Sequence, residues 1–318
     1  MIPMSTRFQS TLLGDLDVEV KLDARIGAST YFAIGGRADM LVYPKSADSL
    51  SLLLQRCHNA EIPFRVLGRG ANLLVDDIGV DGVVVKLDHP CFNQFRFNNE
   101  GTENELHVMG GKDLPSMLME TSRCGMRGLE AMAGIPATIG GALRMNAGGV
   151  YGCISDSVLS VTCLKDQGEL VTYDKNSIAF GYRECRIADP IILSATFGLQ
   201  ECDPTVVRDS IKEIFAWKKS RQPLADSSAG CAFKNPKDDS GERISAGKLI
   251  DEAGLKGHTV GGATVSNRHA NFIVTKPNTP ASDVLTLMDE VKEQVLDSTG
   301  ILLQREVVVW SRDPEVQR

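Results

Sequence analysis

Apolar positions in the first ninety residues alternate between the two-residue period of strands and the spacing of a helix face. Residues 38–43 predict a strand that Pro44 ends, and Ser46 is placed to cap a helix that follows it. The apolar residues of that helix share one face: Leu50, Leu53, Leu54 and Cys57. Residues 64–67 and 83–87 predict two more strands, before and after a glycine-rich segment at 68–72. This part of the chain is predicted to be a small α+β lobe.

Strand patterns dominate the next hundred residues. They are predicted at 105–109, 158–165, 170–173 and 191–199. One helix precedes most of them, with Asp113 as its cap and Gly125 as its end. Residues 134–149 are rich in glycine and fit neither period, so we predict a long structured loop there. A tight crossover between strands is the plain alternative for this segment.

Helical patterns return after Asp203-Pro204. The apolar spacing predicts a helix from there to just before Pro223, a helix at 245–253 closed by Gly254, and a third helix opened by Thr279-Pro280. Strands are predicted at 272–274 and 301–310. We therefore expect domain boundaries that divide the chain into 1–90, 91–202 and 203–318.

Composition excludes several classes of protein. The chain has 318 residues, of which 42% are hydrophobic and 24% are charged, as in ordinary globular proteins. Its net charge of −7 gives no general attraction to nucleic acid or to anionic membranes. The longest uncharged run near the middle, 131–143, is broken by Gly and Pro and falls short of the roughly 20 apolar residues of a membrane helix. We expect neither nucleic acid nor membrane as a partner, and no obligatory protein partner is evident.

The eight cysteines indicate neither a metal site nor a disulfide framework. No two of them form a CxxC pair, and a chain of this size needs no covalent staples. The N-terminal segment lacks the apolar core of an export signal. We expect reduced thiols, no bound metal and a cytosolic location.

Two glycine-rich segments are candidates for binding phosphate. Gly68 and Gly70 let the backbone turn so that successive N–H groups face one point, but for this segment taken alone an ordinary glycine turn is the better explanation. It is not the dinucleotide fingerprint of Rossmann folds, because Leu73 stands where the third glycine belongs and no helix opens at 76–79. The segment at 134–149 would also let a flat ring or a phosphate approach the backbone. One extended nucleotide could use both segments.

Three side chains from distant segments are candidates for chemistry. Cys231 stands among polar and cationic residues, Arg183 follows an aromatic turn, and Glu306 interrupts an apolar strand pattern. Each also has a plain explanation: a small buried hydrophobe, a surface charge and a solvent-facing strand residue. They make sense together only if the fold brings them together.

In combination, these segments resemble the UDP-N-acetylenolpyruvoylglucosamine reductase family, the flavoenzymes that make UDP-N-acetylmuramate for peptidoglycan. The resemblance runs to Glu306 and rests on seven motifs in order: IGGRA at 34–38, GRGANLLV at 68–75, AGIPATIGGA at 133–142, MNAG at 145–148, FGYR at 180–183, GCAFKNP at 230–236 and GLKG at 254–257. The short segment between Arg183 and Ile191 resembles the shorter-looped members of the family.

The resemblance implies an α+β fold with a two-lobed FAD-binding domain, of the type found in vanillyl-alcohol and para-cresol oxidases, and a C-terminal α+β substrate domain. It implies non-covalent FAD, NADPH as reductant and UDP-N-acetylglucosamine enolpyruvate as substrate. Arg183, Cys231 and Glu306 would be catalytic, with Cys231 as proton donor, and Tyr182, Lys234, Asn235 and His269 would bind substrate. The expected FAD-binding residues are Gly68, Arg69, Gly70, Ala71, Asn72, Leu73, Ile135, Pro136, Ala137, Thr138, Gly140, Gly141, Asn146, Ala147 and Gly148.

The sequence departs from the family pattern at a few positions. Cys231 and Ala71 stand where many members carry Ser, and the segment at 149–153 differs from the usual one. Two other functions are considered. One is an oxidase of the same fold with covalently attached FAD, but no His follows the glycines at 68–72. The other is a non-catalytic FAD-binding protein, which would hold flavin without NADPH turnover.

Overall fold

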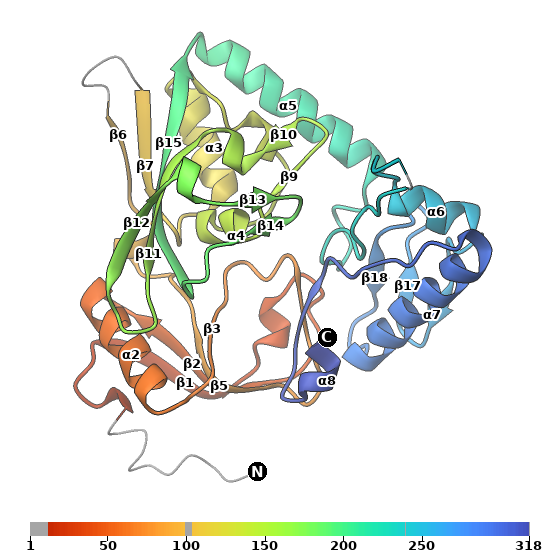
Figure 1. Cartoon of the computed structure of the whole chain (residues 1–318), viewed down its shortest axis with the longest axis horizontal. Helices are drawn as coiled ribbons and strands as arrows, with labels where there is room; N and C mark the ends of the chain where they lie inside the picture. The colour runs from red at the N-terminus through yellow and green to blue at the C-terminus, as the bar shows by residue number, and fades with distance from the viewer. Residues whose placement is uncertain (1–11, 99–103, 239, 318) are drawn as a thin grey trace. The chain divides into compact units, whose positions relative to one another are not determined.

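A computed structural model describes residues 12–98, 104–238 and 240–317 (Figure 1). The chain divides into two compact units, each built from several stretches of sequence. The first unit contains Met1–Leu22, Asp39–Gly68 and Gly82–Phe215, and the second contains Asp23–Ala38, Arg69–Asp81 and Ala216–Arg318. Two short inner stretches, 23–38 and 69–81, therefore fold with the C-terminal third of the chain. The division of the sequence into lobes and a substrate domain remains a proposal.

A four-stranded sheet and one helix follow the pattern of the first ninety residues. The sheet order is β1-β2-β5-β3, with β3 parallel to β5, and α2 shares its core. Ser46 caps α2 as predicted, accepting a hydrogen bond from the Ser49 amide at 3.1 Å. The predicted helix face, Leu50, Leu53, Leu54 and Cys57, is fully buried. The bounds are β1 Val18–Ala24, β2 Ala38–Pro44, α2 Ala47–Asn59, β3 Phe64–Val66, β4 Leu73–Val75 and β5 Val80–Val85.

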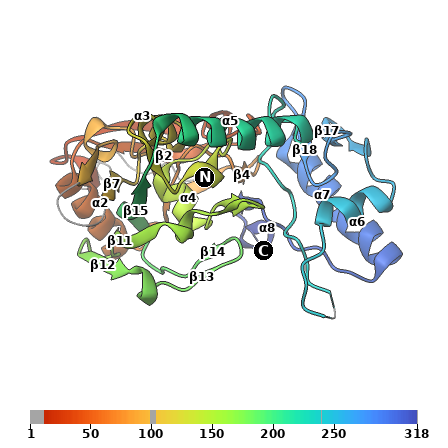
Figure 2. The ribbon, with the colours of Figure 1, turned by 90° about the horizontal axis from the view of Figure 1, so that it is seen from above.

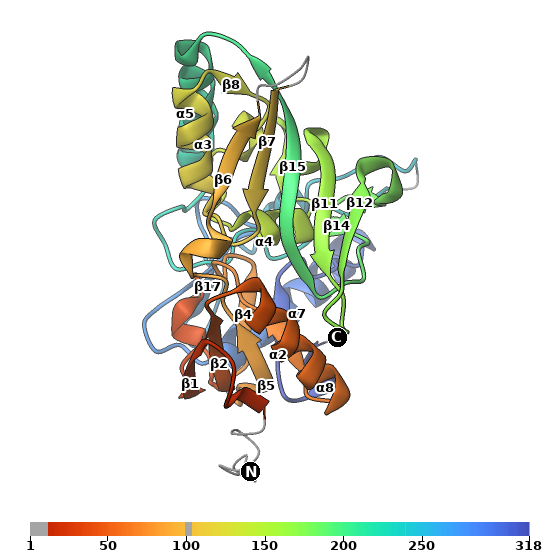
Figure 3. The ribbon, with the colours of Figure 1, turned by 90° about the vertical axis from the view of Figure 1, so that its left-hand side faces the viewer.

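A second sheet of the first unit is antiparallel and has the order β12-β11-β15-β7-β6, with β8 also pairing β15 (Figure 3). The helices α3 and α4 share one apolar core with this sheet. Asp113 caps α3, accepting from the Ser116 amide at 3.0 Å. The bounds are β6 Phe95–Asn98, β7 Asn104–Met109, α3 Leu114–Arg123, β8 Met126–Arg127, α4 Ile139–Arg144, β11 Val158–Leu164, β12 Leu170–Asp174 and β15 Ile191–Glu201.

Two short hairpins lie between these elements in the sequence. They consist of β9 Gly148–Gly149 with β10 Gly152–Cys153, and β13 Phe180–Gly181 with β14 Glu184–Cys185. Short 3-10 helices occupy Gly27–Ser29, Pro90–Phe92, Glu130–Met132, Ile154–Asp156 and Lys175–Ser177.

The second unit has a core of its own, which includes residues of the helices α6 and α7 and of a small antiparallel sheet of order β16-β17-β18. Figure 2 labels β17, β18, α6 and α7. The strand β4 belongs to this unit and pairs in parallel with β19. The long helix α5 begins in the first unit and ends in the second. The bounds are α5 Pro204–Arg221, α6 Ala246–Glu252, β16 Thr259–Val260, β17 Ala263–Val265, β18 Ile273–Thr275, α7 Ala281–Thr299, β19 Val308–Trp310 and α8 Pro314–Gln317.

Two predictions of secondary structure need correction. The segment at 134–149 is not a loop throughout, because it contains α4. Each glycine costs a helix roughly 1 kcal/mol, but the Thr138 cap and tertiary bonds such as Gly140 N–H to Gly110 O at 2.8 Å offset that cost. The closing strand is also shorter than the apolar run at 301–310, since only Val308–Trp310 finds a ladder partner in the three-residue β4.

Within the described ranges, no helix is long and apolar enough to cross a membrane. The described residues include all eight cysteines, and no disulfide links any two of them.

Candidate functional site

The first glycine-rich segment joins β3 to β4 and needs glycine for steric reasons. Gly70 has a φ of +66°, and a Cβ there would lie 2.8 Å from the Cα of Thr30. A Cβ on Gly68 would lie 2.8 Å from the hydroxyl oxygen of Thr138. Gly68 and Thr138 belong to the same unit, so this close approach places the beginning of the first glycine-rich segment against the second one.

The second glycine-rich segment is organised by Thr138. Its hydroxyl oxygen accepts a hydrogen bond from the Gly141 amide at 3.2 Å and so begins α4. Gly141 is exposed, and a Cβ there would meet only the Thr138 hydroxyl within 4 Å. A Cβ on Gly149 would meet no described atom within 4 Å. The backbone here is open to close approach by a ligand.

The residues of both segments fit FAD. Neither 68–72 nor 134–149 contains a carboxylate. Of their two arginines, Arg69 is exposed, whereas the guanidinium of Arg144 donates to the backbone carbonyls of Ile187 and Asp189. Backbone N–H groups and a threonine hydroxyl are the donors that suit a diphosphate, and open glycines allow a flat ring to lie against the backbone. The donor set therefore suits an anionic dinucleotide and carries no negative group that would repel it.

The expected FAD-binding residues divide between the two units. Gly68 and the residues from 135 to 148 lie in the first unit, and Arg69 to Leu73 lie in the second. Arg69 is exposed, while Leu73 is buried in β4. Asn72 has a structural role that the sequence did not predict, because its Nδ2 donates to the backbone carbonyl of Glu306 at 3.1 Å.

Arg183 stands at the turn of the β13–β14 hairpin and is held against the second glycine-rich segment. Its φ of +57° is a left-handed conformation that this turn imposes on a residue other than glycine. Its Nη1 donates to the carbonyl of Gly148 at 2.7 Å, and the guanidinium lies 5.3 Å from the centre of the Tyr182 ring. The buried Asn146 donates from Nδ2 to the carbonyl of Gly181 at 2.8 Å. The FGYR and MNAG motifs thus meet within the first unit.

Cys231 and Glu306 are brought together in the second unit, although 75 positions separate them in the sequence. The Glu306 amide donates to the carbonyl of Ala232 at 2.8 Å, and Phe233 forms a β-bridge with Arg305. Cys231 and Glu306 are both half-buried. The thiol and the carboxylate therefore come from adjoining backbone segments of fixed register.

The expected substrate-binding residues of the second unit have local partners. Asn235 accepts at Oδ1 from the Ala246 amide at 3.0 Å and so holds the start of α6. The His269 Nδ1 accepts from the Asn271 amide at 3.2 Å, and its ring packs edge-on against Phe272. Burial lowers the pKa of His269, which keeps the imidazole neutral and its Nδ1 able to accept. Lys234 is half-buried, and its amide donates to Gln304 O at 2.9 Å.

Most of the other thiols are chemically quiet. Burial raises the pKa of Cys57 and of Cys163 to about 12. Burial also raises the pKa values of Cys91, Cys153 and Cys185. Since the thiolate is the nucleophile, these five thiols are poor nucleophiles near neutral pH.

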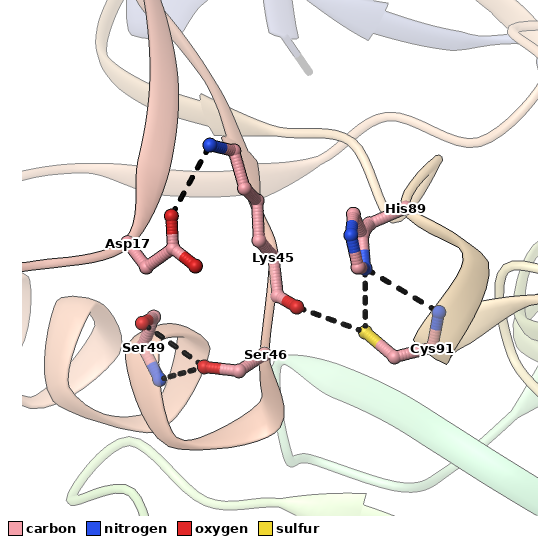
Figure 4. Close-up of polar contacts among 6 residues, drawn as sticks. All are labelled: Asp17, Lys45, Ser46, Ser49, His89 and Cys91. Carbon is pink, nitrogen blue, oxygen red and sulfur yellow. Dashed lines mark hydrogen bonds and ion pairs between the residues drawn. The ribbon is translucent and has the colours of Figure 1, made fainter.

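A polar cluster in the first unit holds a cysteine and a histidine but no metal site (Figure 4). The Nδ1 of His89 lies 3.1 Å from the Sγ of Cys91, and the Cys91 thiol donates to the carbonyl of Lys45 at 3.4 Å. The Lys45 side chain pairs with Asp17 at 3.2 Å. Across the part of the chain that the structure describes, no group of three or more His, Cys, Asp or Glu side chains could hold a metal ion.

Sequence reasoning passed over Asn271, whose side chain bonds the backbone of Phe233. The Phe233 amide donates to Asn271 Oδ1 at 2.9 Å, and Asn271 Nδ2 donates to the Phe233 carbonyl at 2.8 Å. An amide side chain within an apolar run, here between Ala270 and Phe272, was the available signal.

Family models match both halves of the chain. A model described as an FAD binding domain matches residues 38–174, and one described as the C-terminal domain of UDP-N-acetylenolpyruvoylglucosamine reductase matches residues 222–310. The fold and the paired glycine-rich segments thus define an FAD-binding oxidoreductase with a separate C-terminal domain. The predicted fold class and FAD as cofactor are confirmed.

Similar proteins of known name agree with this class. The chain is 34% identical to the UDP-N-acetylenolpyruvoylglucosamine reductase of Trichormus variabilis, over 91% of this chain and 86% of that protein. It is 39% identical to that of Heliobacterium modesticaldum, over 88% and 87%. The crystal structure of the Thermus caldophilus enzyme is similar with a TM-score of 0.76 and 35% identity, covering 93% of this chain and all of that one. The chain belongs to the UDP-N-acetylenolpyruvoylglucosamine reductase family.

Proposed function

We propose that this protein uses NADPH to reduce the enolpyruvyl ether of UDP-N-acetylglucosamine enolpyruvate, which gives UDP-N-acetylmuramate for peptidoglycan synthesis. Family membership over nearly the whole chain supports this reaction. The observation that carries the mechanism is the 2.8 Å bond from the Glu306 amide to the Ala232 carbonyl. It holds the backbone next to Cys231, the proposed proton donor, against the backbone of Glu306, the carboxylate proposed to act with it.

The reaction adds a hydride to C3 of the enolpyruvyl group and a proton to C2. Bound FAD would supply the redox chemistry that carries hydride from NADPH to C3. Negative charge then develops through C2 into the substrate carboxylate, and the guanidinium of Arg183 stabilises it. The 2.7 Å bond from Arg183 to Gly148 fixes the cation before the charge develops, so little reorganisation is needed.

Cys231 holds the proton that C2 receives. Its thiol transfers that proton to C2, which completes the saturated ether, and the thiolate is reprotonated from solvent. Glu306 acts beside it on the enolic charge, either protonated or offset by Arg183, because a bare carboxylate next to the substrate carboxylate would repel it.

The remaining site residues are Tyr182, Lys234 and Asn235, which belong to the FGYR and GCAFKNP motifs, and His269, which lies outside the seven motifs. Tyr182 and Lys234 would contact substrate directly. Asn235 would contact substrate while its Oδ1 holds α6, and His269 would use its Nε2, because its Nδ1 accepts from Asn271. FAD would be held without a covalent bond by the predicted residues of 68–73, 135–141 and 146–148.

The proposal also covers the location of the protein in the cell and the division of its chain into domains. We place the protein in the cytosol, where thiols stay reduced, with no nucleic acid, membrane or obligatory protein as partner. The proposed division is an FAD-binding lobe at 1–90, a second lobe at 91–202 and a substrate domain at 203–318.

The test is an assay of NADPH oxidation with purified protein and UDP-N-acetylglucosamine enolpyruvate. We expect a yellow protein that releases intact FAD on denaturation, oxidises NADPH in the presence of the substrate and forms UDP-N-acetylmuramate. A protein that holds FAD but gives no substrate-dependent oxidation is instead a non-catalytic flavin binder. A protein that takes up no flavin removes the whole proposal.

A further inference from the structure

The side chain of Asn271 is devoted to the backbone of one residue. Asn271 is 2% exposed and Phe233 is 1% exposed, so neither reaches solvent. The amide group of Asn271 accepts from the Phe233 N–H at 2.9 Å and donates to the Phe233 carbonyl at 2.8 Å. It thus replaces the pair of bonds that a neighbouring strand would make.

The backbone of Asn271 holds the same segment. Its carbonyl accepts from the Ala232 amide at 2.7 Å, and its own amide donates to His269 Nδ1 at 3.2 Å. Cys231, one residue earlier, forms a β-bridge with Phe272. The segment that carries the thiol is therefore bonded along its length to 271–272.

The other edge of this segment contacts the chain that carries Glu306. The carbonyl of Ala232 accepts from the Glu306 amide at 2.8 Å, and the Lys234 amide donates to the Gln304 carbonyl at 2.9 Å. The segment lies between the Asn271 chain and the Glu306 chain. A shift at Phe233 would move the thiol and the carboxylate relative to each other.

Packing alone does not explain an asparagine here. A leucine has the same number of side-chain heavy atoms and the same branching, and the residues next to it in the chain, Ala270, Phe272 and Ile273, are buried and apolar. It would, however, leave the buried N–H and carbonyl of Phe233 without partners, which is costly where water is excluded. The two hydrogen bonds therefore explain why an asparagine stands here, and they fix the register of the segment 231–233 that carries the Cys231 thiol.

We propose that Asn271 is a positioning residue that sets Cys231 and Glu306 in register for protonation of C2. The inference rests on the proposed function, because it assigns Asn271 to the proton-donating half of that reaction. It touches no reacting atom and acts through the backbone of 231–233.

The main test is Asn271→Leu, with Asn267→Leu as matched control. Asn267 is an exposed residue four positions earlier on the same loop. Stopped-flow absorbance separates flavin reduction by NADPH from flavin reoxidation by UDP-N-acetylglucosamine enolpyruvate. In Asn271→Leu we expect reoxidation to slow by about tenfold or more while reduction and substrate KM change by less than about threefold. The control should match wild type in both half-reactions.

Asn271→Asp gives a second and independent readout. An ionised Asp cannot donate to the Phe233 carbonyl, whereas a protonated one can. Relative to wild type, the reoxidation rate of this variant should therefore be at least about fivefold higher at about pH 6 than at about pH 8.5. This variant also serves if Asn271→Leu does not fold.

The outcomes separate the two proposals. Wild-type protein without substrate-dependent NADPH oxidation refutes the proposed function itself. If wild type turns over, the inference is wrong when a folded, flavin-loaded Asn271→Leu reoxidises within about twofold of wild type. It is equally wrong when the Asn271→Asp rate shows no pH dependence beyond that of wild type.

Discussion

The carboxylate of Asp77 holds the first turn of α7, although 204 positions separate it from that helix in the sequence. Its Oδ1 accepts from the Ala281 amide at 2.8 Å and its Oδ2 accepts from the Ser282 amide at 3.0 Å. The residue at the N-cap itself is Pro280, whose side chain makes no capping bond. Asp77→Ala therefore removes the only side-chain cap that the described residues give this 19-residue helix.

The magnitude follows from these two bonds. Loss of an N-cap side chain costs about 0.5–2 kcal/mol, and a negative charge at a helix N-terminus contributes about 0.3–1 kcal/mol more. Asp77 is exposed, so water replaces part of what is lost. We expect Asp77→Ala to lower the free energy of unfolding by roughly 1–2 kcal/mol, which corresponds to roughly 2–8 °C in Tm for a unit of this size.

Tryptophan fluorescence reports this unit selectively. The chain has two tryptophans, Trp217 and Trp310, and both belong to the second unit. Glu293→Ala is the matched control, because it removes an exposed carboxylate from the same helix without touching its first turn. Asp77→Asn should fall between wild type and Asp77→Ala, since it keeps one acceptor. A transition for Asp77→Ala within about 1 °C of the Glu293→Ala control would refute the capping argument.

Three further predictions concern the site. Arg183→Ala and Glu306→Gln should each slow flavin reoxidation by substrate by roughly a hundredfold or more, with flavin reduction by NADPH much less affected; stopped-flow rates near wild type would remove that residue from the site. Cys231→Ser should keep substantial activity and extend it to higher pH, because thiols in general ionise near pH ~8.5 and hydroxyls do not. Cys231→Ala should stall reoxidation, and normal incorporation of solvent deuterium at C2 in that variant would place the proton donor elsewhere. Burial lowers the pKa of His269 below its unfolded value, so the unfolded chain binds more protons than the folded one. The stability of the wild type should therefore fall as the pH drops below about 6.5. His269→Asn keeps an acceptor for the Asn271 amide but does not titrate. Urea unfolding at several pH values should show a flatter acid dependence in the variant, and equal slopes would contradict the argument.

Local chemistry made much of the fold readable from the sequence. The caps at Ser46, Asp113 and Ser245 each accept from an amide three positions later, so the whole interaction lies within four residues. The buried apolar residues of α2 and α7 recur with the period of the helix, so this pattern is also local in the sequence. The site residues were predicted in a different way, from several motifs that occur in a fixed order along the chain. Arg183, Cys231 and Glu306 lie in three distant segments, so no local spacing relates them.

Long-range contacts decided the rest. The apolar run at 301–310 carries strand composition, but its ladder ends where the three-residue β4 ends. The helix α4 forms in a glycine-rich segment because the backbone around Gly110 bonds to it. Asp77 caps a distant helix, and Asn271 completes the backbone of Phe233. In each case the hydrogen-bond or strand partner comes from a part of the chain that only tertiary packing brings near. A local sequence pattern therefore cannot predict that partner.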